Sequence, residues 1–334
     1  MNMQSDIIVP ANIEKAAAKA SEQLSKAKTE IGQVILGQAN VVDLALAAML
    51  SGGHALLVGV PGLAKTLLVE TLGTVLGLSD KRIQFTPDLM PADIVGSEVL
   101  EETAKGKRSF RFIPGPVFCQ LLMADEINRA SPRTQSALLQ AMQERFVTVA
   151  GQRHDLPAPF HVLATQNPIE QEGTYPLPEA QLDRFLFQID VGFPELGTER
   201  DILVATTGAN DASAKKVMTP KQLIDMQKLV RQLPVGENVV EAILTLVRNA
   251  RPEQSALSEI KDSVSWGPGP RAGQALMLAT RAKALMEGRL SPSIDDVLHL
   301  ATPVLQHRMA LTFAARADGQ SISTTIAKLK ESIA

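Results

Sequence analysis

Leu121-Leu122-Met123-Ala124-Asp125-Glu126 is the stretch of sequence that decides the fold. Its four apolar residues are typical of a buried strand, and its two carboxylates stand where that strand ends. A strand that ends in Asp-Glu is the arrangement with which many nucleotide hydrolases hold Mg²⁺ and orient an attacking water. Alone the pattern is weak, because buried strands often end in an acid, so a second feature is needed.

That second feature is a loop directly after the apolar run 55–58, and it reads Gly59-Val60-Pro61-Gly62-Leu63-Ala64-Lys65-Thr66. A phosphate loop turns its backbone N–H groups inward, and glycine supplies the unusual dihedrals. The common pattern is G-x-x-x-x-G-K-[ST], and here Ala64 stands in place of the second glycine while Gly62 supplies another. A helix is expected from Lys65, and its N-terminus favours anions.

Together the two segments predict a site for ATP and Mg²⁺. Lys65 would contact the β and γ phosphates, and the Thr66 hydroxyl would ligate Mg²⁺ together with Asp125. Glu126 would act as the general base on the attacking water. The alternative, two solvated acids that cap the next helix, leaves the buried strand before them unexplained. The predicted nucleotide-binding residues are Gly59, Val60, Pro61, Gly62, Leu63, Ala64, Lys65, Thr66, Leu67 and Asp125.

An amide follows the next expected strand, which covers residues 161–165. If that strand lies beside strand 120–124, Asn167 would stand near the γ-phosphate and could help to hold the attacking water. The alternative is an Asn that merely forms a turn before Pro168.

Three arginines compete for the role of an arginine finger, a side chain that reaches the γ-phosphate bound by a neighbouring subunit. Arg184 precedes the last expected strand and would face away from its own phosphate loop, so we favour it over Arg129 and Arg133. Farther along, Arg271 follows Pro270 at a helix start. A positive charge there is unfavourable beside the positive end of the helix dipole, and a phosphate would relieve the conflict.

Composition limits the class of protein. The chain has 334 residues, 45% of them hydrophobic and 4% aromatic, with a net charge of −3. The length suits two domains with an aliphatic core, and the charge argues against a protein held on nucleic acid mainly by phosphate contacts. The single cysteine, Cys119, fits a reducing compartment. We find no signal pattern and no apolar run of about 20 residues, so we expect a cytoplasmic protein without membrane insertion.

The fold class follows from the alternation of elements. We expect helices at 11–36, 41–50, 65–76 and 132–144, and strands at 54–58, 82–86, 120–124, 161–165 and 185–191. Short apolar strands between helices predict an α/β fold, in which a parallel sheet is covered on both faces.

Two segments interrupt the alternation and suggest hairpin insertions, at about 87–117 and 145–160. After Pro194 the expected strands stop and capped helices follow, beginning with the capping box Thr219-Pro220-Lys221-Gln222. We therefore expect an α/β core with N-terminal helices over residues 1–193 and an all-helical domain over 194–334.

These motifs, in this order, resemble those of the AAA+ ATPases. Residues 59–66 and 121–126 look like the two Walker motifs, and Asn167, Arg184 and Arg271 look like sensor 1, the arginine finger and sensor 2. The sequences of segments 59–66, 125–144 and 164–170 are similar to those of the MoxR family, in which an alanine at the position of Ala64 is usual. One local difference is Gly269, which stands where relatives often carry Ser. The two hairpins look like insertions of one AAA+ clade, which includes magnesium-chelatase motors and minichromosome-maintenance helicases.

The resemblance spans nearly the whole chain and implies a P-loop NTPase core with a C-terminal all-α lid. It also implies ATP hydrolysis with Mg²⁺, assembly into a ring, usually hexameric, and chaperone-like remodelling or maturation of client protein complexes. MoxR proteins typically work with a partner that carries a von Willebrand factor A domain. The client, the ring size, and whether Arg271 acts within or between subunits stay open.

Two other functions stay open as alternatives. A nucleic-acid translocase is suggested by a basic strip with interleaved aromatics: Lys105, Lys107, Arg108, Phe110, Arg111 and Phe112. The resemblance adds a magnesium-chelatase-like motor subunit to this alternative. The net charge favours a solvated hairpin instead, so nucleic acid is not the partner we expect. A nucleotide-dependent scaffold without turnover is the other alternative, and Glu126 and Arg184 argue against it.

Overall fold

The computed structural model describes residues 11–102, 108–170, 173–208 and 212–333, and within them a five-stranded sheet forms the centre of the α/β part. The strand order is β2-β5-β8-β1-β9, and every pairing in it is parallel. The strands are β1 (Ala55–Val58), β2 (Asp80–Gln84), β5 (Leu121–Asp125), β8 (His161–Gln166) and β9 (Phe187–Asp190). β5 and β8 are neighbours, so their carboxyl ends meet at one edge of the sheet.

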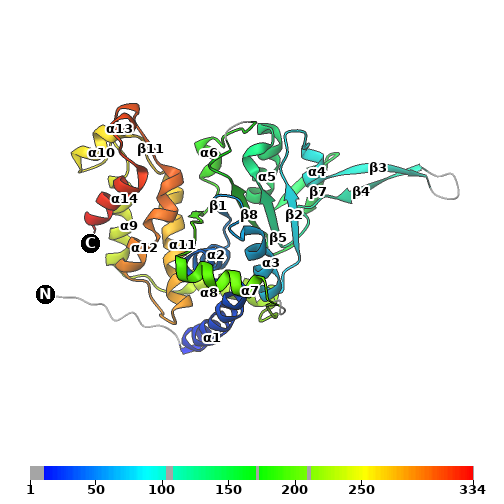
Figure 1. Cartoon of the computed structure of the whole chain (residues 1–334), viewed down its shortest axis with the longest axis horizontal. Coiled ribbons are helices and arrows are strands. Elements are labelled where there is room, and N and C mark those ends of the chain that lie inside the picture. Colours follow the sequence, from blue (N-terminus) through cyan, green and yellow to red (C-terminus); the bar gives the residue numbers. More distant parts are fainter. Residues whose placement is uncertain (1–10, 103–107, 171–172, 209–211, 334) are drawn as a thin grey trace.

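Helices cover both faces of the sheet. Successive side chains of a strand point to opposite faces, so neighbouring residues of β1 pack against different helices. Leu57 of β1 packs in the same apolar cluster as α1 (Ala11–Val34), α2 (Ala39–Leu50) and α3 (Lys65–Leu76). Leu56, one residue earlier, joins a second cluster with α5 (Pro132–Glu144) and α4 (Pro91–Val95). In Figure 1 the sheet lies between these two groups of helices. This two-sided burial is the reason that β1 is apolar throughout and that the centres of β5 and β8 are apolar.

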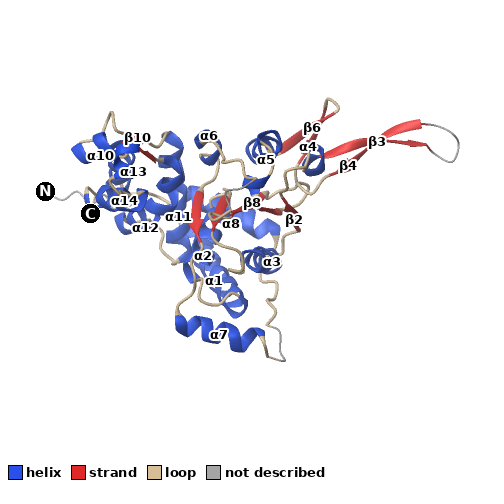
Figure 2. Cartoon of the chain, turned by 45° about the horizontal axis from the view of Figure 1, so that its top comes forward, coloured by secondary structure: helices blue, strands red, loops and turns tan. Residues whose placement is uncertain are grey.

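Two antiparallel hairpins extend from the core. β3 (Gly96–Glu102) pairs with β4 (Arg108–Pro114), and β6 (Phe146–Val149) pairs with β7 (Gln152–Asp155). The β3–β4 hairpin projects far from the body of the molecule (Figures 1 and 2).

The two described arginines of the basic strip predicted on this hairpin are each paired with a carboxylate. Arg108 pairs with Glu102 at 3.3 Å, and Arg111 pairs with Glu101 at 3.2 Å. Lys105 and Lys107 lie outside the described residues.

The chain after β9 is mainly helical. Its helices are α7 (Leu196–Thr206), α8 (Pro220–Gln232), α9 (Glu237–Asn249), α10 (Ser258–Ser263), α11 (Pro270–Met286), α12 (Ile294–Leu305), α13 (Phe313–Ala317) and α14 (Ile322–Glu331). The expectation that strands stop after Pro194 was wrong in one detail, because β10 (Val264–Trp266) pairs with β11 (Ala310–Leu311). Strands of three and two residues are too short for a period-two pattern to reveal.

The helical part is joined to the core in two ways. Its buried residues, such as Leu276 of α11, belong to the same apolar cluster as α1, α2 and α3. Arg308, in the short 3-10 helix η2 (Gln306–Arg308), is 2% exposed and donates to the carboxylate of Asp183, ahead of β9. None of the described helices combines the length and the apolar character that a membrane span requires.

Some predicted boundaries shift. β2 begins two residues earlier than expected, because it is an exposed edge strand in register with β5 from Asp80 onwards. β9 begins at Phe187 rather than 185, since the N–H of Phe185 still bonds the carbonyl of Leu182 in a turn at 3.0 Å. α1 ends at Val34, before Gly37, which has φ +70°.

Candidate active site

The loop between β1 and α3 has the backbone of an anion site. Gly62 and Ala64 both have positive φ values, 87° and 55°, and Ala64 is the residue from which α3 begins. Such left-handed residues turn successive N–H groups towards one point, and the first N–H groups of α3 have no partner inside the helix. Gly59 is required for another reason, because a Cβ there would lie 2.6 Å from the carbonyl oxygen of Val191. The loop is therefore pressed against the end of β9.

Lys65 bends back over this loop. Its Nζ donates to the carbonyl oxygens of Gly59 and Val60 at 2.6 and 2.7 Å. Burial lowers the pKa of Lys65, while the nearby carboxylates of Asp125 and Glu126 act in the opposite direction. The ammonium group is thus held by backbone carbonyls close to two carboxylates, a position from which it can contact phosphate oxygens.

Asp125 and Glu126 stand at the carboxyl end of β5. Asp125 Oδ2 accepts from Arg82 Nη2 at 2.6 Å, and Glu126 Oε2 accepts from Gln84 Nε2 at 2.7 Å. Both partners come from the edge strand β2, which runs beside β5. Glu126 has φ 54°, a left-handed conformation that costs about 1–2 kcal/mol for an L-residue.

Thr165, near the end of β8, connects the two acids. Its hydroxyl donates to Asp125 Oδ1 at 2.5 Å and accepts from the backbone N–H of Glu126 at 2.9 Å. Thr165 is buried, so these bonds are shielded from water. No role for Thr165 was predicted from the sequence, where its only signal was its place near Asn167 at the end of an apolar strand.

A pocket of about 490 Å³ brings most of the predicted residues together. It is lined by Pro61, Gly62, Leu63, Ala64, Lys65, Thr66, Leu67, Arg82, Gln84, Asp125, Glu126, Thr165 and Asn167. Gly59 and Val60 do not line it and contact Lys65 through their carbonyls instead. Asn167 is buried, and its Oδ1 accepts from the N–H of Ile169 at 3.1 Å, which leaves the amide nitrogen for another acceptor.

A residue that the sequence analysis missed also supports the loop. Gln38 precedes α2, and its Nε2 donates to the carbonyl oxygen of Leu63 at 3.1 Å. The two residues are 25 positions apart, and no local pattern points to this bond.

A nucleotide and Mg²⁺ fit this pocket. Its volume lies within the range of small-molecule sites, and its phosphate side is formed by left-handed backbone, a helix N-terminus and Lys65. Mg²⁺ is commonly bound through one or two carboxylates together with substrate phosphates. The carboxylate of Asp125 and the hydroxyl of Thr66 offer oxygen ligands of this kind. Over the described ranges no cluster of three or more His, Cys, Asp or Glu could hold a metal alone.

A second pocket, of about 390 Å³, lies elsewhere and is strongly basic. Four arginines line it together with one carboxylate, Asp183: Arg145, Arg184, Arg271 and Arg308. Arg271 Nη1 approaches Asp183 Oδ2 at 3.4 Å. Among the described residues, none lines both pockets, so Arg184 and Arg271 are not brought to Lys65 and Glu126 of the same chain.

The two competing finger candidates lie elsewhere. Arg129 pairs with Glu126 at 3.2 Å and with Glu170 at 3.6 Å, so it belongs to its own chain's acidic site. Arg133 is exposed in the first turn of α5.

Comparison with known proteins places the chain among nucleotide hydrolases. Residues 54–187 match the model of the ATPase family associated with various cellular activities (AAA), and residues 257–329 match the AAA lid domain. The first match contains the phosphate loop, both acids, Asn167 and Arg184, and the second contains Arg271.

Whole-length relatives agree with these matches. The chain is 42% identical to the chaperone MoxR1 of Mycobacterium tuberculosis, over 97% of this chain and 85% of that protein. It is 40% identical to the uncharacterized protein YeaC of Bacillus subtilis, over 93% and 94%, and 30% identical to the protein MoxR of Paracoccus denitrificans, over 86% and 88%. A crystal structure from Cytophaga hutchinsonii, described as a candidate ATPase, superposes with a TM-score of 0.88 at 35% identity and covers 95% of this chain and 96% of that one.

Proposed function

The chain belongs to the MoxR family of AAA+ ATPases, and from this premise we propose that it hydrolyses ATP to remodel or mature partner protein complexes. In this proposal it acts as a ring of identical subunits, six in number, together with a protein that carries a von Willebrand factor A domain. The observation that carries the proposal is the single pocket in which Lys65, Asp125, Glu126 and Asn167 meet. We propose the division into a core, 1–193, and a lid, 194–334, as part of it.

The residues of the pocket divide the chemistry between them. Lys65 and the loop backbone hold the β and γ phosphates, while Thr66 and Asp125 hold the Mg²⁺ ion. Bound Mg²⁺ neutralises charge that develops on the phosphate oxygens. Glu126 takes a proton from the attacking water as the water oxygen bonds to the γ-phosphorus. The bond between the γ-phosphorus and the β–γ bridging oxygen breaks at the same time. Asn167 donates to that water, and ADP and phosphate leave.

Arg184 and Arg271 act on a neighbouring subunit in this proposal. They line the basic pocket, which shares none of its described lining residues with the phosphate pocket. An interface that joins two different surfaces head to tail closes into a ring if the rotation allows it. Such an interface would bring the arginines of one subunit to the γ-phosphate bound by the next, where an arginine finger increases turnover strongly.

The protruding β3–β4 hairpin supports a role in contacting a partner or client protein. Leu100 and Phe110 are paired across it, and they are 54% and 71% exposed. Large apolar side chains on an exposed projection favour a protein contact over a solvated hairpin.

Mixing inactive variants tests the proposal. Lys65→Ala and Arg184→Ala should each reduce ATP turnover by a factor on the order of 100 or more. Mixed together, they should regain turnover, because an Arg184→Ala subunit keeps its phosphate loop and a Lys65→Ala neighbour supplies Arg184. The measurement is steady-state phosphate release, with particle mass recorded with and without ATP.

Arg184→Ala mixed with Arg271→Ala is the matched control. Every interface in that mixture lacks one of the two arginines, so no recovery is expected. Recovery in the control would mean that Arg271 acts within its own subunit, and no recovery in the first mixture would contradict action of Arg184 between subunits. Glu126→Gln should bind ATP without hydrolysing it, and undiminished turnover would remove Glu126 from the mechanism.

A further inference from the structure

Helix α7 is exposed along its whole length. None of its eleven residues, all within the described part of the chain, is buried, and Leu196, Leu203 and Val204 are 85%, 64% and 70% exposed. Figure 2 shows α7 standing apart from the rest of the molecule. A helix of this length is marginal in water by itself, so a partner for its apolar side would stabilise it.

The helix has a defined outward face. Thr198 packs so closely on Gly37 that a Cβ at position 37 would lie 2.1 Å from it. Leu196, Glu199 and Leu203 are three and four residues apart, so they share one exposed face of the helix, and Arg200 and Val204 lie on the exposed side next to it. The face formed by Leu196, Glu199 and Leu203 therefore has a carboxylate between two leucines.

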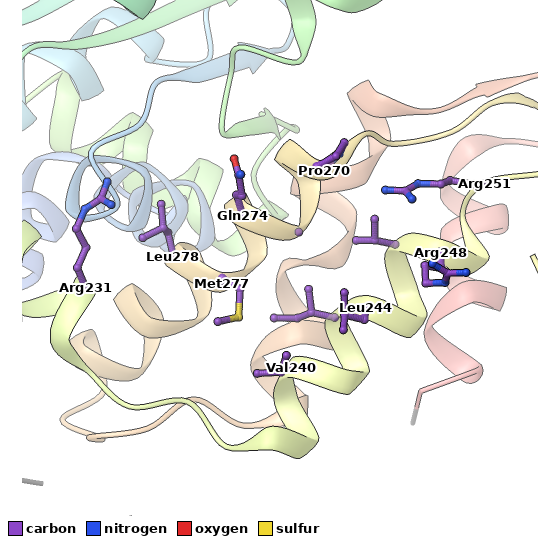
Figure 3. Close-up of a pocket in the computed structure, with 12 residues that line it drawn as sticks. Arg231, Val240, Leu244, Arg248, Arg251, Pro270, Gln274, Met277 and Leu278 are labelled. Atoms are coloured by element: carbon purple, nitrogen blue, oxygen red, sulfur yellow. The ribbon is translucent and has the colours of Figure 1, made fainter. Parts of the chain in front are cut away.

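A groove of matching character lies in the lid. It has a volume of about 660 Å³ and runs between α9 and α11 (Figure 3). Its apolar lining includes Val240, Leu244, Met277 and Leu278, and three arginines stand around it: Arg231, Arg248 and Arg251. Over the described ranges none of these arginines forms an ion pair.

The charges of the helix and the groove are complementary. The segment of α7 carries three exposed carboxylates, Glu195, Glu199 and Asp201, against one cation, Arg200. None of the three is paired within the described residues. An apolar helix face that includes the unpaired carboxylate of Glu199 suits an apolar groove bordered by arginines.

The positions of the two surfaces agree with the proposed ring. α7 lies beside the phosphate loop, because Thr198 packs on Gly37 and the next residue, Gln38, bonds the carbonyl of Leu63. The groove adjoins the basic pocket, since Gln274 and Leu278 of α11 line both. Head-to-tail packing that brings the basic pocket of one subunit to the phosphate loop of the next would therefore bring the groove and α7 to the same interface.

We infer that α7 of each subunit docks by its Leu196–Glu199–Leu203 face into the groove between α9 and α11 of the adjacent subunit. The inference rests on the proposed head-to-tail ring and adds a second contact to each interface. Docking would join the segment after β9, which touches the phosphate loop at Gly59, to the neighbour's lid. The occupant of the groove is thus a second copy of this chain.

Disulfide crosslinking tests the contact directly. The chain has one cysteine, Cys119, which is buried, and its burial raises the pKa of the thiol to about 12, so it reacts slowly. Leu203→Cys and Leu244→Cys would be made separately in the Glu126→Gln background, with tags of different size, and mixed. With ATP and mild oxidation we expect a disulfide between the two variants, and Ala205→Cys, on the other side of α7, should give about tenfold less product.

Two outcomes separate this inference from the ring itself. If ATP produces rings by particle mass and Leu203→Cys does not crosslink to Leu244→Cys, or crosslinks only to itself, the docking is wrong and the ring stands. If no variant assembles with ATP, both the proposed ring and the proposed docking are wrong.

Charge reversal supplies a second test on the full-length chain. Glu199→Arg and Arg248→Glu should each raise the protein concentration needed for half-assembly by roughly tenfold, since like charges would then meet in the groove. The chain that carries both changes should recover most of the loss. Absence of an effect, or a doubled defect in the double variant, would overturn the docking.

Discussion

At the scale of single residues, Thr165 determines how the two acids of the candidate site are held. Glu126 adopts a left-handed conformation, and the bond from its N–H to the Thr165 hydroxyl helps to keep it there. The same hydroxyl donates to Asp125, so one side chain holds the Asp125 carboxylate and the backbone from which the Glu126 side chain projects. We therefore regard Thr165 as a positioning residue.

Replacement of Thr165 by valine removes the hydroxyl and keeps the shape. We expect kcat for ATP hydrolysis to fall by a factor on the order of 10 to 100, since catalytic geometry tolerates little displacement. KM should change by less than about threefold, because the phosphate loop is untouched. The measurement is steady-state ATP turnover over a range of ATP concentrations.

Thr165→Ser is the control, because serine keeps both hydrogen bonds and should retain most of the activity. Equal losses in the serine and valine variants would mean that packing, and not the hydroxyl, matters at this position.

At the scale of elements, Arg308 ties the lid to the core. All five N–H groups of its guanidinium are used: Nε donates to Asp183 Oδ1, and the terminal nitrogens donate to the carbonyls of Leu186, Val304, Asp183 and Phe185. These acceptors lie in α12 and in the turn before β9. A buried cation with every donor satisfied fixes the position of η2 against the sheet.

Arg308→Ala should lower the free energy of unfolding by about 3–5 kcal/mol, because it leaves several buried carbonyls unpaired and leaves Asp183 with only its 3.4 Å contact to Arg271. Arg308→Lys should also destabilise, since an ammonium group cannot reach all five acceptors. Urea titration followed by circular dichroism measures the change. Arg316→Ala, at an exposed position, should stay within about 0.5 kcal/mol of the parent, and a similarly small effect for Arg308→Ala would contradict the anchoring role.

At the scale of the whole molecule, the sequence predicts what local pattern encodes. The alternation of short apolar strands, such as 55–58 and 121–124, with helices predicted the parallel sheet, because strands buried on both faces are largely apolar. The phosphate loop could be predicted because its residues are contiguous in the sequence. The roles of Thr165 and Gln38 could not be predicted, since their hydrogen-bond partners lie 40 and 25 positions away.

The position of the lid on the core also could not be predicted from the sequence. Arg271 comes to lie beside Asp183, 88 positions earlier, and only the packing of α11 on the core decides this. An exposed edge strand such as β2 lacks the apolar signal that would mark its ends.

Three buried histidines, His54, His161 and His307, make the stability of the fold depend on pH. His54 Nδ1 accepts from the N–H of Val162, so Nε2 carries the proton and donates to the carbonyl of Met142. His161 donates from Nδ1 to the carbonyl of Gly53 and accepts at Nε2 from Gln227. Each ring is therefore held neutral, and burial lowers the pKa of His54 to about 3 and that of His161 to about 4. Burial also lowers the pKa of His307.

These shifts predict that the protein loses stability in mild acid. Above pH 6.5 the three rings are neutral in both states, so their contribution is complete. As the pH falls from about 6.5 towards 4, these histidines bind protons in the unfolded chain but not in the folded one. Each ring then lowers the free energy of unfolding by about 1.4 kcal/mol per pH unit. Unfolding by urea at pH 7 and 5.5 should therefore differ by about 4 kcal/mol.

Comparison of two variants isolates this effect from that of the carboxylates. His161→Gln removes one titrating ring, so its loss of stability between pH 7 and 5.5 should be smaller than that of the parent by about 1.4 kcal/mol. His299→Gln, at an exposed position, should leave the loss unchanged. Because only the difference between the two pH values is compared, any direct cost of removing the His161 hydrogen bonds cancels. If both variants lose as much as the parent, His161 is not held neutral, and the hydrogen bonds from Gln227 and to Gly53 do not set its protonation.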